Sequence, residues 1–223
     1  VEAKPTRRNP GPPFTTSTLQ QAASSRLGFS ANRTMQVAQR LYEGLDVGGE
    51  TVGLITYMRT DGVQMAPEAI SAARAAISKE FGDSYMPEKP RFYSAKAKNA
   101  QEAHEAIRPT DFFRTPASVR QYLDADQARL YELIWKRAIA SQMNAAEIER
   151  TTVEIEAVNG QRSANLRAVG SVIRFDGFIA AYTDQKEEDS EDEENRRLPE
   201  IRQGEALDRE AVNATQHTTE PPP

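Results

Sequence analysis

The stretch TTVEIEAVNGQRSANLRAV, residues 151–169, marks a change of character in this chain of 223 residues. Apolar and polar residues alternate on both sides of Asn159-Gly160. An Asn-Gly pair between two alternating segments is typical of a β-hairpin. We therefore expect strands at residues 151–158, 162–169, 173–182 and 205–212.

The sequence before this hairpin has helical periodicity instead. Apolar residues recur every three or four positions, and we expect helices at residues 17–27, 31–43, 67–81, 101–107, 116–123 and 124–143. The first two are joined by Gly28-Phe29-Ser30 in a helix-turn-helix arrangement. Residues 44–53 contain four glycines and are expected to form a loop that leads into a strand at 52–57.

The order extended, helical, extended predicts an α+β protein with two domains. We expect a helical domain over residues 18–150. It is inserted into a discontinuous, mainly β domain formed by residues 1–17 and 151–223, which contains an acidic loop at 184–197.

Composition excludes several classes of protein. Hydrophobic residues make up 38% of the chain, the mean hydropathy is −0.67, and no apolar run approaches the ~18 residues of a membrane span. Cysteine is absent, so disulfides and thiolate metal sites are excluded. We expect a cytoplasmic protein without a membrane contact.

Charge is distributed unevenly within the net value of −5. Residues 1–150 carry 20 Lys and Arg against 17 Asp and Glu, whereas residues 151–223 carry 8 against 16. Seven of the eight residues in Glu187–Glu194 are acidic. Such a run is more typical of a solvated loop than of metal binding or nucleic-acid mimicry.

Familiar nucleotide and zinc motifs are missing from the sequence. No phosphate-binding loop, Gly-x-Gly-x-x-Gly or His-Glu-x-x-His occurs, which argues against nucleotide hydrolysis and zinc hydrolysis. Asp124 and Asp126 could suggest a magnesium pair. Because they stand at an expected helix start, capping of that helix is the better interpretation, and no metal site is expected in this chain.

A tyrosine and an arginine are paired in ITYMRTDG, residues 55–62. In an extended chain Tyr57, Arg59 and Asp61 share one face. A tyrosine that attacks phosphorus at neutral pH needs nearby positive charge to stabilise the phenolate and the transition state, and Arg59 could supply it. By spacing alone, an ordinary strand-end tyrosine beside a solvated arginine is the more common interpretation.

A second candidate segment is NAQEAHEAIRPT, residues 99–110. On a helix, Gln101, His104 and Arg108 fall at i, i+3 and i+7 and present donors suited to a phosphate or a base edge. A lone helical histidine between two glutamates is, however, more often a surface or capping residue.

Together the two segments resemble the active-site motifs of type IA DNA topoisomerases. Residues 55–61 are similar to the tyrosine motif of that family, and residues 101–109 to its histidine motif. Residues 13–22, 38–43 and 130–135 fit as well, so the resemblance covers most of residues 13–182. The bacterial topoisomerase I branch fits better than topoisomerase III or reverse gyrase, although Gly62 replaces a common serine and the loop at 44–53 is longer than in many members.

The resemblance implies an ATP-independent isomerase that relaxes negative supercoils. Tyr57 would attack one strand of single-stranded DNA, become linked to a 5′ phosphate, allow another strand to pass and then reverse the reaction. Arg59 would hold the scissile phosphate, and His104 would contact DNA near the cleavage site, with Gln101 and Arg108 as further DNA-binding residues. Weak, salt-sensitive binding of single strands is expected, because the basic excess is small.

The resemblance also implies partners within the same polypeptide. The helical domain corresponds to the winged-helix-like domain III of the family, and the β domain to part of its arch-shaped domain II. The family's Toprim domain, which binds Mg²⁺, and further domains would lie outside this chain. We therefore expect a fragment of a monomeric, nucleoid-associated bacterial enzyme that is inactive by itself.

Two interpretations from other classes remain open. The chain could be a noncatalytic module that binds single-stranded DNA or reads a duplex through its helix-turn-helix. Residues 30–43 offer only Arg33 and Arg40 for that purpose, which is little for base recognition. It could also be a structural arch that clamps partners without contacting DNA.

Overall fold

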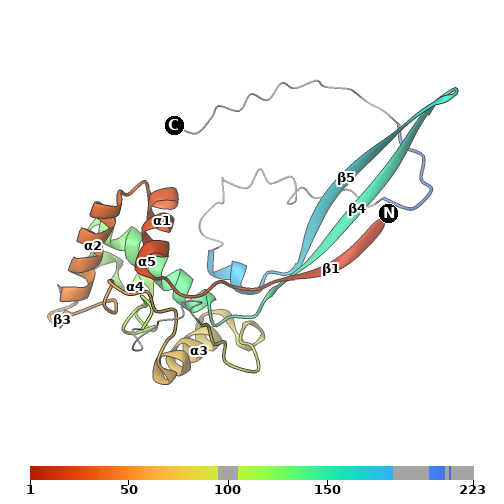
Figure 1. Cartoon of the computed structure of the whole chain (residues 1–223). Coiled ribbons are helices and arrows are strands. Elements are labelled where there is room, and N and C mark those ends of the chain that lie inside the picture. The colour runs from red at the N-terminus through yellow and green to blue at the C-terminus, as the bar shows by residue number, and fades with distance from the viewer. Residues whose placement is uncertain (95–104, 183–200, 209–210, 212–223) are drawn as a thin grey trace.

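The computed structural model describes residues 1–94, 105–182, 201–208 and 211 as a mixed helix-and-sheet protein. A helical body continues into a long β ribbon that projects away from it (Figure 1). The helices are α1 (Thr16–Leu27), α2 (Ala31–Glu43), α3 (Pro67–Phe81), α4 (Pro116–Val119) and α5 (Ala125–Ala140). The 3₁₀ turns are η1 (Asp83–Tyr85), η2 (Arg120–Tyr122) and η3 (Gly177–Tyr182). The strands are β1 (Glu2–Arg8), β2 (Leu45–Asp46), β3 (Thr51–Val52), β4 (Ala146–Asn159) and β5 (Arg162–Phe175).

Local capping explains the helix pair α1 and α2. Thr15 and Thr18 form a reciprocal capping box at the start of α1, and the Ser30 side chain accepts from the backbone N–H of Arg33 at the start of α2. Gly28 ends α1 with φ of 69°, a left-handed conformation that glycine adopts without a steric penalty. The helix-turn-helix expected from the sequence is therefore present.

Helix α5 lies at the centre of the helical body. Asp124 and Gln127 form its capping box, and the helix packs against α1, α2, α3, α4 and η3. Leu130, Tyr131 and Ile134 on this helix are completely shielded from solvent. Burial of one such side chain contributes about 1.5–3 kcal/mol, so this face of α5 holds the body together.

The ribbon is a three-stranded antiparallel sheet in the order β1-β4-β5. Asn159 pairs with Arg162, which leaves Gly160 and Gln161 as the turn, and Gly160 has φ of 61°. The expected hairpin is therefore present, with strands longer than the sequence indicated. The N-terminal strand β1, for which the sequence offered no periodicity, pairs with residues 146–152 of β4.

Three expected strands were wrong in whole or in part. Strand β5 runs to Phe175, and the following residues form η3 instead of a strand to 182. Gly177 there has φ of 51°, and a Cβ would lie 2.5 Å from the carbonyl oxygen of Ala145, so the chain bends sharply at a position that only glycine fits. Of the strand expected at 205–212, residues 205–208 and 211 are not in a strand, and the others lie outside the described residues. Of the strand expected at 52–57, only Val52 is in one.

Two further expectations were corrected. The loop at 44–53 contains a short hairpin, β2–β3, instead of being irregular throughout. The helix expected at 101–107 is wrong for residues 105–107, which are extended and form β-bridges, while 101–104 lie outside the described residues. Among the helices of the described ranges, none is both long and apolar enough to cross a membrane.

Candidate active site

Tyr57 lies on a loop whose side chains alternate between solvent and core. Met58 and Thr60 are buried, whereas Tyr57, Arg59 and Asp61 are exposed. The shared face expected for these three residues is present, although the backbone is a loop and not a strand. Tyr57 is 47% exposed, so its phenol is open to a molecule in solvent.

Thr16, the first residue of α1, fixes the loop from one side. Its hydroxyl donates to the carbonyl of Met58 at 2.7 Å and accepts from the backbone N–H of Thr60 at 2.8 Å. The backbone N–H of Thr16 donates to the carbonyl of Thr60 at 2.9 Å. The two residues that flank Arg59 are thus tied to the beginning of a helix.

Residues 105–110 fix the same loop from the other side. The backbone N–H of Thr56 donates to the carbonyl of Arg108 at 2.9 Å, and its hydroxyl donates to the carbonyl of Ala106 at 2.8 Å. The N–H of Ile107 donates to the carbonyl of Phe14 at 2.8 Å. The described end of the histidine segment therefore lies directly beside the tyrosine segment, 50 residues earlier in the chain.

Helix α2 brings a second tyrosine to the site. The rings of Tyr42 and Tyr57 lie 5.4 Å apart in an edge-to-face arrangement with an interplanar angle of 65°. Both side chains are partly open to solvent, so the contact restricts the Tyr57 ring without covering it. Sequence reasoning missed this contact because a 14-residue segment separates the two positions.

Arg59 borders a hollow of about 560 Å³ along the exposed side of α2. The other residues around it all come from that helix: Asn32, Met35, Gln36, Gln39, Arg40 and Glu43. This polar depression lies next to the tyrosine loop. No periodic signal in the sequence indicates it, because its members are ordinary solvent-facing residues of an amphipathic helix.

Arg108 does not lie on the helical face expected for it. Its guanidinium holds the carboxylate of Glu105 through two contacts, of 2.6 and 3.1 Å, and its side chain is only 14% exposed. The same carboxylate accepts from the backbone N–H of Ala66, directly before α3, at 2.7 Å. Arg108 is thus engaged in joining segments of the body. Gln101 and His104 lie outside the described residues.

Three other tyrosines differ from Tyr57 in their surroundings. Burial raises the pKa of Tyr131 above its ordinary value, and its hydroxyl donates to the carbonyl of Arg114 at 2.6 Å. Burial also raises the pKa of Tyr93. A hydrogen bond to Asp176 raises the pKa of Tyr85. These three hydroxyls are committed to partners or to a buried environment within the protein, so Tyr57 is a better candidate than any of them for attack on an external group.

The two aspartates at the start of α5 have structural roles. Asp124 caps the helix, and Asp126 accepts two hydrogen bonds from the guanidinium of Arg33, at 2.6 and 2.8 Å. Within the described ranges, no group of three or more histidine and carboxylate side chains could hold a metal ion. The described residues therefore do not fit a magnesium site.

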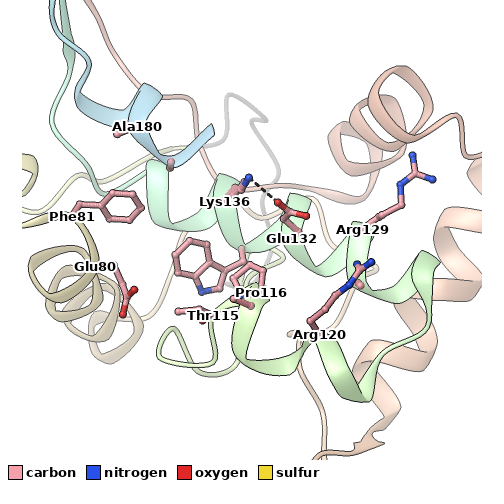
Figure 2. A pocket seen from close by; sticks show the side chains of 13 residues that line it. Glu80, Phe81, Thr115, Pro116, Arg120, Arg129, Glu132, Lys136 and Ala180 are labelled. Carbon is pink, nitrogen blue, oxygen red and sulfur yellow. Dashed lines mark ion pairs between the residues drawn. The ribbon is translucent and has the colours of Figure 1, made fainter. Parts of the chain in front are cut away.

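A larger hollow, of about 660 Å³, lies away from the tyrosine loop between α3, α4, α5 and η3 (Figure 2). Trp135 and Phe81 line it together with Arg120 and Arg129. The buried amine of Lys136 pairs there with Glu132 at 2.7 Å. None of the candidate catalytic residues lines this hollow, so its size does not make it the reactive site.

Comparison with known proteins identifies the family. A family model described as DNA topoisomerase matches residues 1–223, and the chain belongs to that family. It is similar to the DNA topoisomerase 1 of Rickettsia felis, with 50% identity over 223 residues, and to that of Zymomonas mobilis, with 53% identity over 227 residues. The resemblance drawn from the two motifs is thereby confirmed.

A solved structure supports the same relationship. Full-length topoisomerase I from Thermotoga maritima matches 90% of this chain with a TM-score of 0.72 and 36% sequence identity. The chain spans only 30% of that protein, and 28% and 18% of the Rickettsia and Zymomonas relatives.

Proposed function

We propose that this chain is the tyrosine-bearing part of a type IA DNA topoisomerase that cleaves and rejoins one DNA strand. The observation that carries the proposal is the Tyr57 loop. It presents an exposed phenol and an exposed guanidinium on one side, while hydrogen bonds to Thr16 and to residues 106–108 fix its backbone. An exposed nucleophile and an exposed cation on the same side of a backbone that is held in place suit attack on a phosphodiester.

The proposed reaction exchanges one phosphoester for another. The Tyr57 oxygen forms a bond to the scissile phosphorus, the bond from phosphorus to the 3′ oxygen breaks, and the phenolic proton leaves while the 3′ oxygen gains one. Arg59 neutralises charge on the phosphate during both steps. The 5′-phosphotyrosine retains the energy of the broken bond, so the reverse attack by the 3′ hydroxyl reseals the strand without ATP.

The remaining assignments follow from the family and belong to the same proposal. The helical body acts as a winged-helix-like domain III inserted into an arch formed in part by the ribbon. His104 and Gln101 contact single-stranded DNA near the cleavage site. Mg²⁺ is held by a Toprim domain elsewhere in a monomeric polypeptide, which works in the bacterial cytoplasm with the nucleoid.

A covalent-trapping experiment tests the proposal. The whole polypeptide is incubated with Mg²⁺ and a single-stranded oligonucleotide labelled at its 3′ end, then denatured, and the labelled peptide is mapped by mass spectrometry. We expect the label on Tyr57, because a 5′-phosphotyrosine retains the 3′ part of the strand. Tyr57→Phe should abolish the adduct, and Tyr122→Phe, a change at another exposed tyrosine, should leave it intact.

The alternative outcome has a clear meaning. If a folded, DNA-binding polypeptide forms no adduct on Tyr57, the chain is a binding module and Tyr57 is an ordinary loop residue. A module that reads duplex DNA through its helix-turn-helix has little support, because Asp126 already holds Arg33, one of the two arginines of α2.

A further inference from the structure

The hollow beside Arg59 is built almost entirely by one side of α2. Asn32, Gln36 and Arg40 lie one helical turn apart along that helix with Gln39 beside Arg40, and Arg59 closes the hollow from the tyrosine loop. Its volume of about 560 Å³ is within the range of ligand-binding clefts. The depression therefore continues the surface that carries Tyr57 along the length of a helix.

The guanidinium groups around this hollow are available to a ligand. Most arginines described between residues 9 and 145 have a hydrogen bond, an ion pair or an aromatic ring as partner. Arg33, for example, is held by Asp126, and Arg108 by Glu105. Within the described residues, the guanidinium groups of Arg40, Arg59 and Arg120 have none of these partners. Two of these three arginines border the same hollow, and Arg120 lines the distant one.

The acidic side chain in the hollow does not cancel this charge. Glu43 accepts a hydrogen bond of 2.6 Å from the amide of Gln39, which directs its carboxylate along the helix. Two cations therefore face one carboxylate, and the other members are neutral amides and Met35. This combination suits a phosphate flanked by a sugar.

We propose that the hollow is a subsite for the DNA strand next to the cleavage point, with Arg40 contacting the phosphate adjacent to the one that Arg59 holds. The inference rests on the proposed function, because it takes Arg59 as the contact to the scissile phosphate. Asn32 and Gln36 offer amide donors and acceptors to the same nucleotide. The subsite is assigned to the backbone and not to the bases, so the effect of Arg40 on binding should be the same for every sequence.

Salt dependence of binding provides the first test. Binding of several single-stranded oligonucleotides to the whole polypeptide is measured by fluorescence anisotropy, in a Tyr57→Phe background that prevents cleavage. We expect Arg40→Gln to weaken binding about tenfold at low salt for every sequence, and to reduce the salt slope by about 0.7, the value for loss of one single-strand phosphate contact. Arg120→Gln is the matched control, because it removes an equally unpartnered arginine from the distant hollow and should change neither quantity.

The position of the contact is tested with modified DNA. A neutral methylphosphonate is placed at successive positions along an oligonucleotide that is cleaved at a mapped site. At the position adjacent to the cleavage point, the modification should weaken binding of the Arg40 protein but not of the Arg40→Gln variant. Equal effects on both proteins at every position, or equal binding by the Arg40→Gln and Arg120→Gln variants, would overturn the subsite.

This design separates failure of the subsite from failure of the proposed function. Binding in the Tyr57→Phe background does not depend on catalysis, whereas the covalent adduct does. Normal adduct formation with no Arg40 effect would reject the subsite alone. Absence of any adduct on Tyr57 would reject the assignment of the hollow to a cleavage point as well.

Discussion

Thr16 is the first residue of α1 and also holds the backbone of the tyrosine loop in place. Its hydroxyl both donates to the Met58 carbonyl and accepts from the Thr60 N–H, so one side chain satisfies two backbone groups of the tyrosine loop. We expect Thr16→Ala to lower the free energy of unfolding by about 1–3 kcal/mol, because both groups lose a partly buried partner. It should also reduce the yield of covalent adduct in the whole polypeptide.

Denaturant unfolding and adduct yield measure these two effects. Thr16→Ser is the control, because it retains the hydroxyl and should behave nearly like the original chain. If Thr16→Ala and Thr16→Ser form equal amounts of adduct, the hydroxyl does not position the loop.

A variant at Arg108 distinguishes the DNA-binding role that the sequence predicts from the structural role seen in the fold. We expect Arg108→Gln to destabilise the chain by about 1–3 kcal/mol, because it leaves the carboxylate of Glu105 without its cation in a partly buried place. The salt slope of DNA binding should stay unchanged, unlike that of Arg40→Gln. A reduced slope at full stability would instead restore Arg108 as a phosphate contact.

Tyr131 predicts how stability depends on alkaline pH. Its pKa is raised in the folded protein, whereas in the unfolded chain it is near 10. The folded state therefore keeps the proton longer, and the stabilisation is complete below pH 10 and is lost as the pH rises above it. The expected slope from this residue is about −1.4 kcal/mol per pH unit.

Urea unfolding between pH 9 and pH 11 measures this slope. Tyr131→Phe should show a shallower decline, although it is about 1 kcal/mol less stable at neutral pH because the hydrogen bond to Arg114 is lost. Tyr122→Phe, a change at an exposed tyrosine, serves as the comparison. Identical slopes in all three proteins would contradict the assignment to Tyr131.

At the scale of the elements, two variants at the start of α5 compare the stabilisation from a helix cap with that from a surface ion pair. Asp124→Ala removes a reciprocal cap from the central helix, and we expect a loss of about 1 kcal/mol. Asp126→Ala removes the ion pair with Arg33, in which both partners are partly exposed, and should cost less than about 1 kcal/mol. Thermal unfolding of the two variants compares these costs directly, and a reversed order would mean that the ion pair matters more than the cap.

Elements bounded by local signals were the ones that the sequence predicted well. The helices α1, α2, α3 and α5 and the β4–β5 hairpin have caps, glycines or an Asn-Gly pair at their ends, and these act within a few residues. Strand β1 and the extended conformation of residues 105–107 depend on partners far along the chain. Such pairing leaves no periodic trace in a short segment, which explains why a helix was expected where Ile107 bonds to Phe14.

The candidate site also has features that follow from local sequence and features that arise only from folding. Motif spacing alone predicted that Tyr57 and Arg59 share a face, because alternation is a local property of extended backbone. The contributions of Thr16, Tyr42 and the hollow along α2 arise only from folding and could not be read from spacing. The structural role of Arg108 could not be read from spacing either, because the carboxylate of Glu105 that it holds also accepts a hydrogen bond from the backbone N–H of Ala66, far away in the sequence.

At the scale of the whole molecule, the prediction concerns activity of the chain by itself. The chain spans 30% of a solved full-length topoisomerase I, and its described residues do not fit a metal site. We expect the purified 223-residue chain to leave a negatively supercoiled plasmid unchanged on an agarose gel, with or without Mg²⁺. Relaxation by this chain alone would show that the reaction needs no further part of the polypeptide.

Few of the described arginines of the helical body are without a partner in the protein, and this number affects how long DNA stays bound. Every phosphate contact that a protein makes must be broken before the strand can leave, so each additional contact lengthens the residence time of DNA. Most arginines of the helical body hold carbonyls, carboxylates or rings of the protein itself, and residues 1–150 carry only three more basic than acidic side chains. If the chain acts as we propose, we expect such a body to hold a strand at a few points near Tyr57 and to release it quickly, which suits a surface that strands must pass.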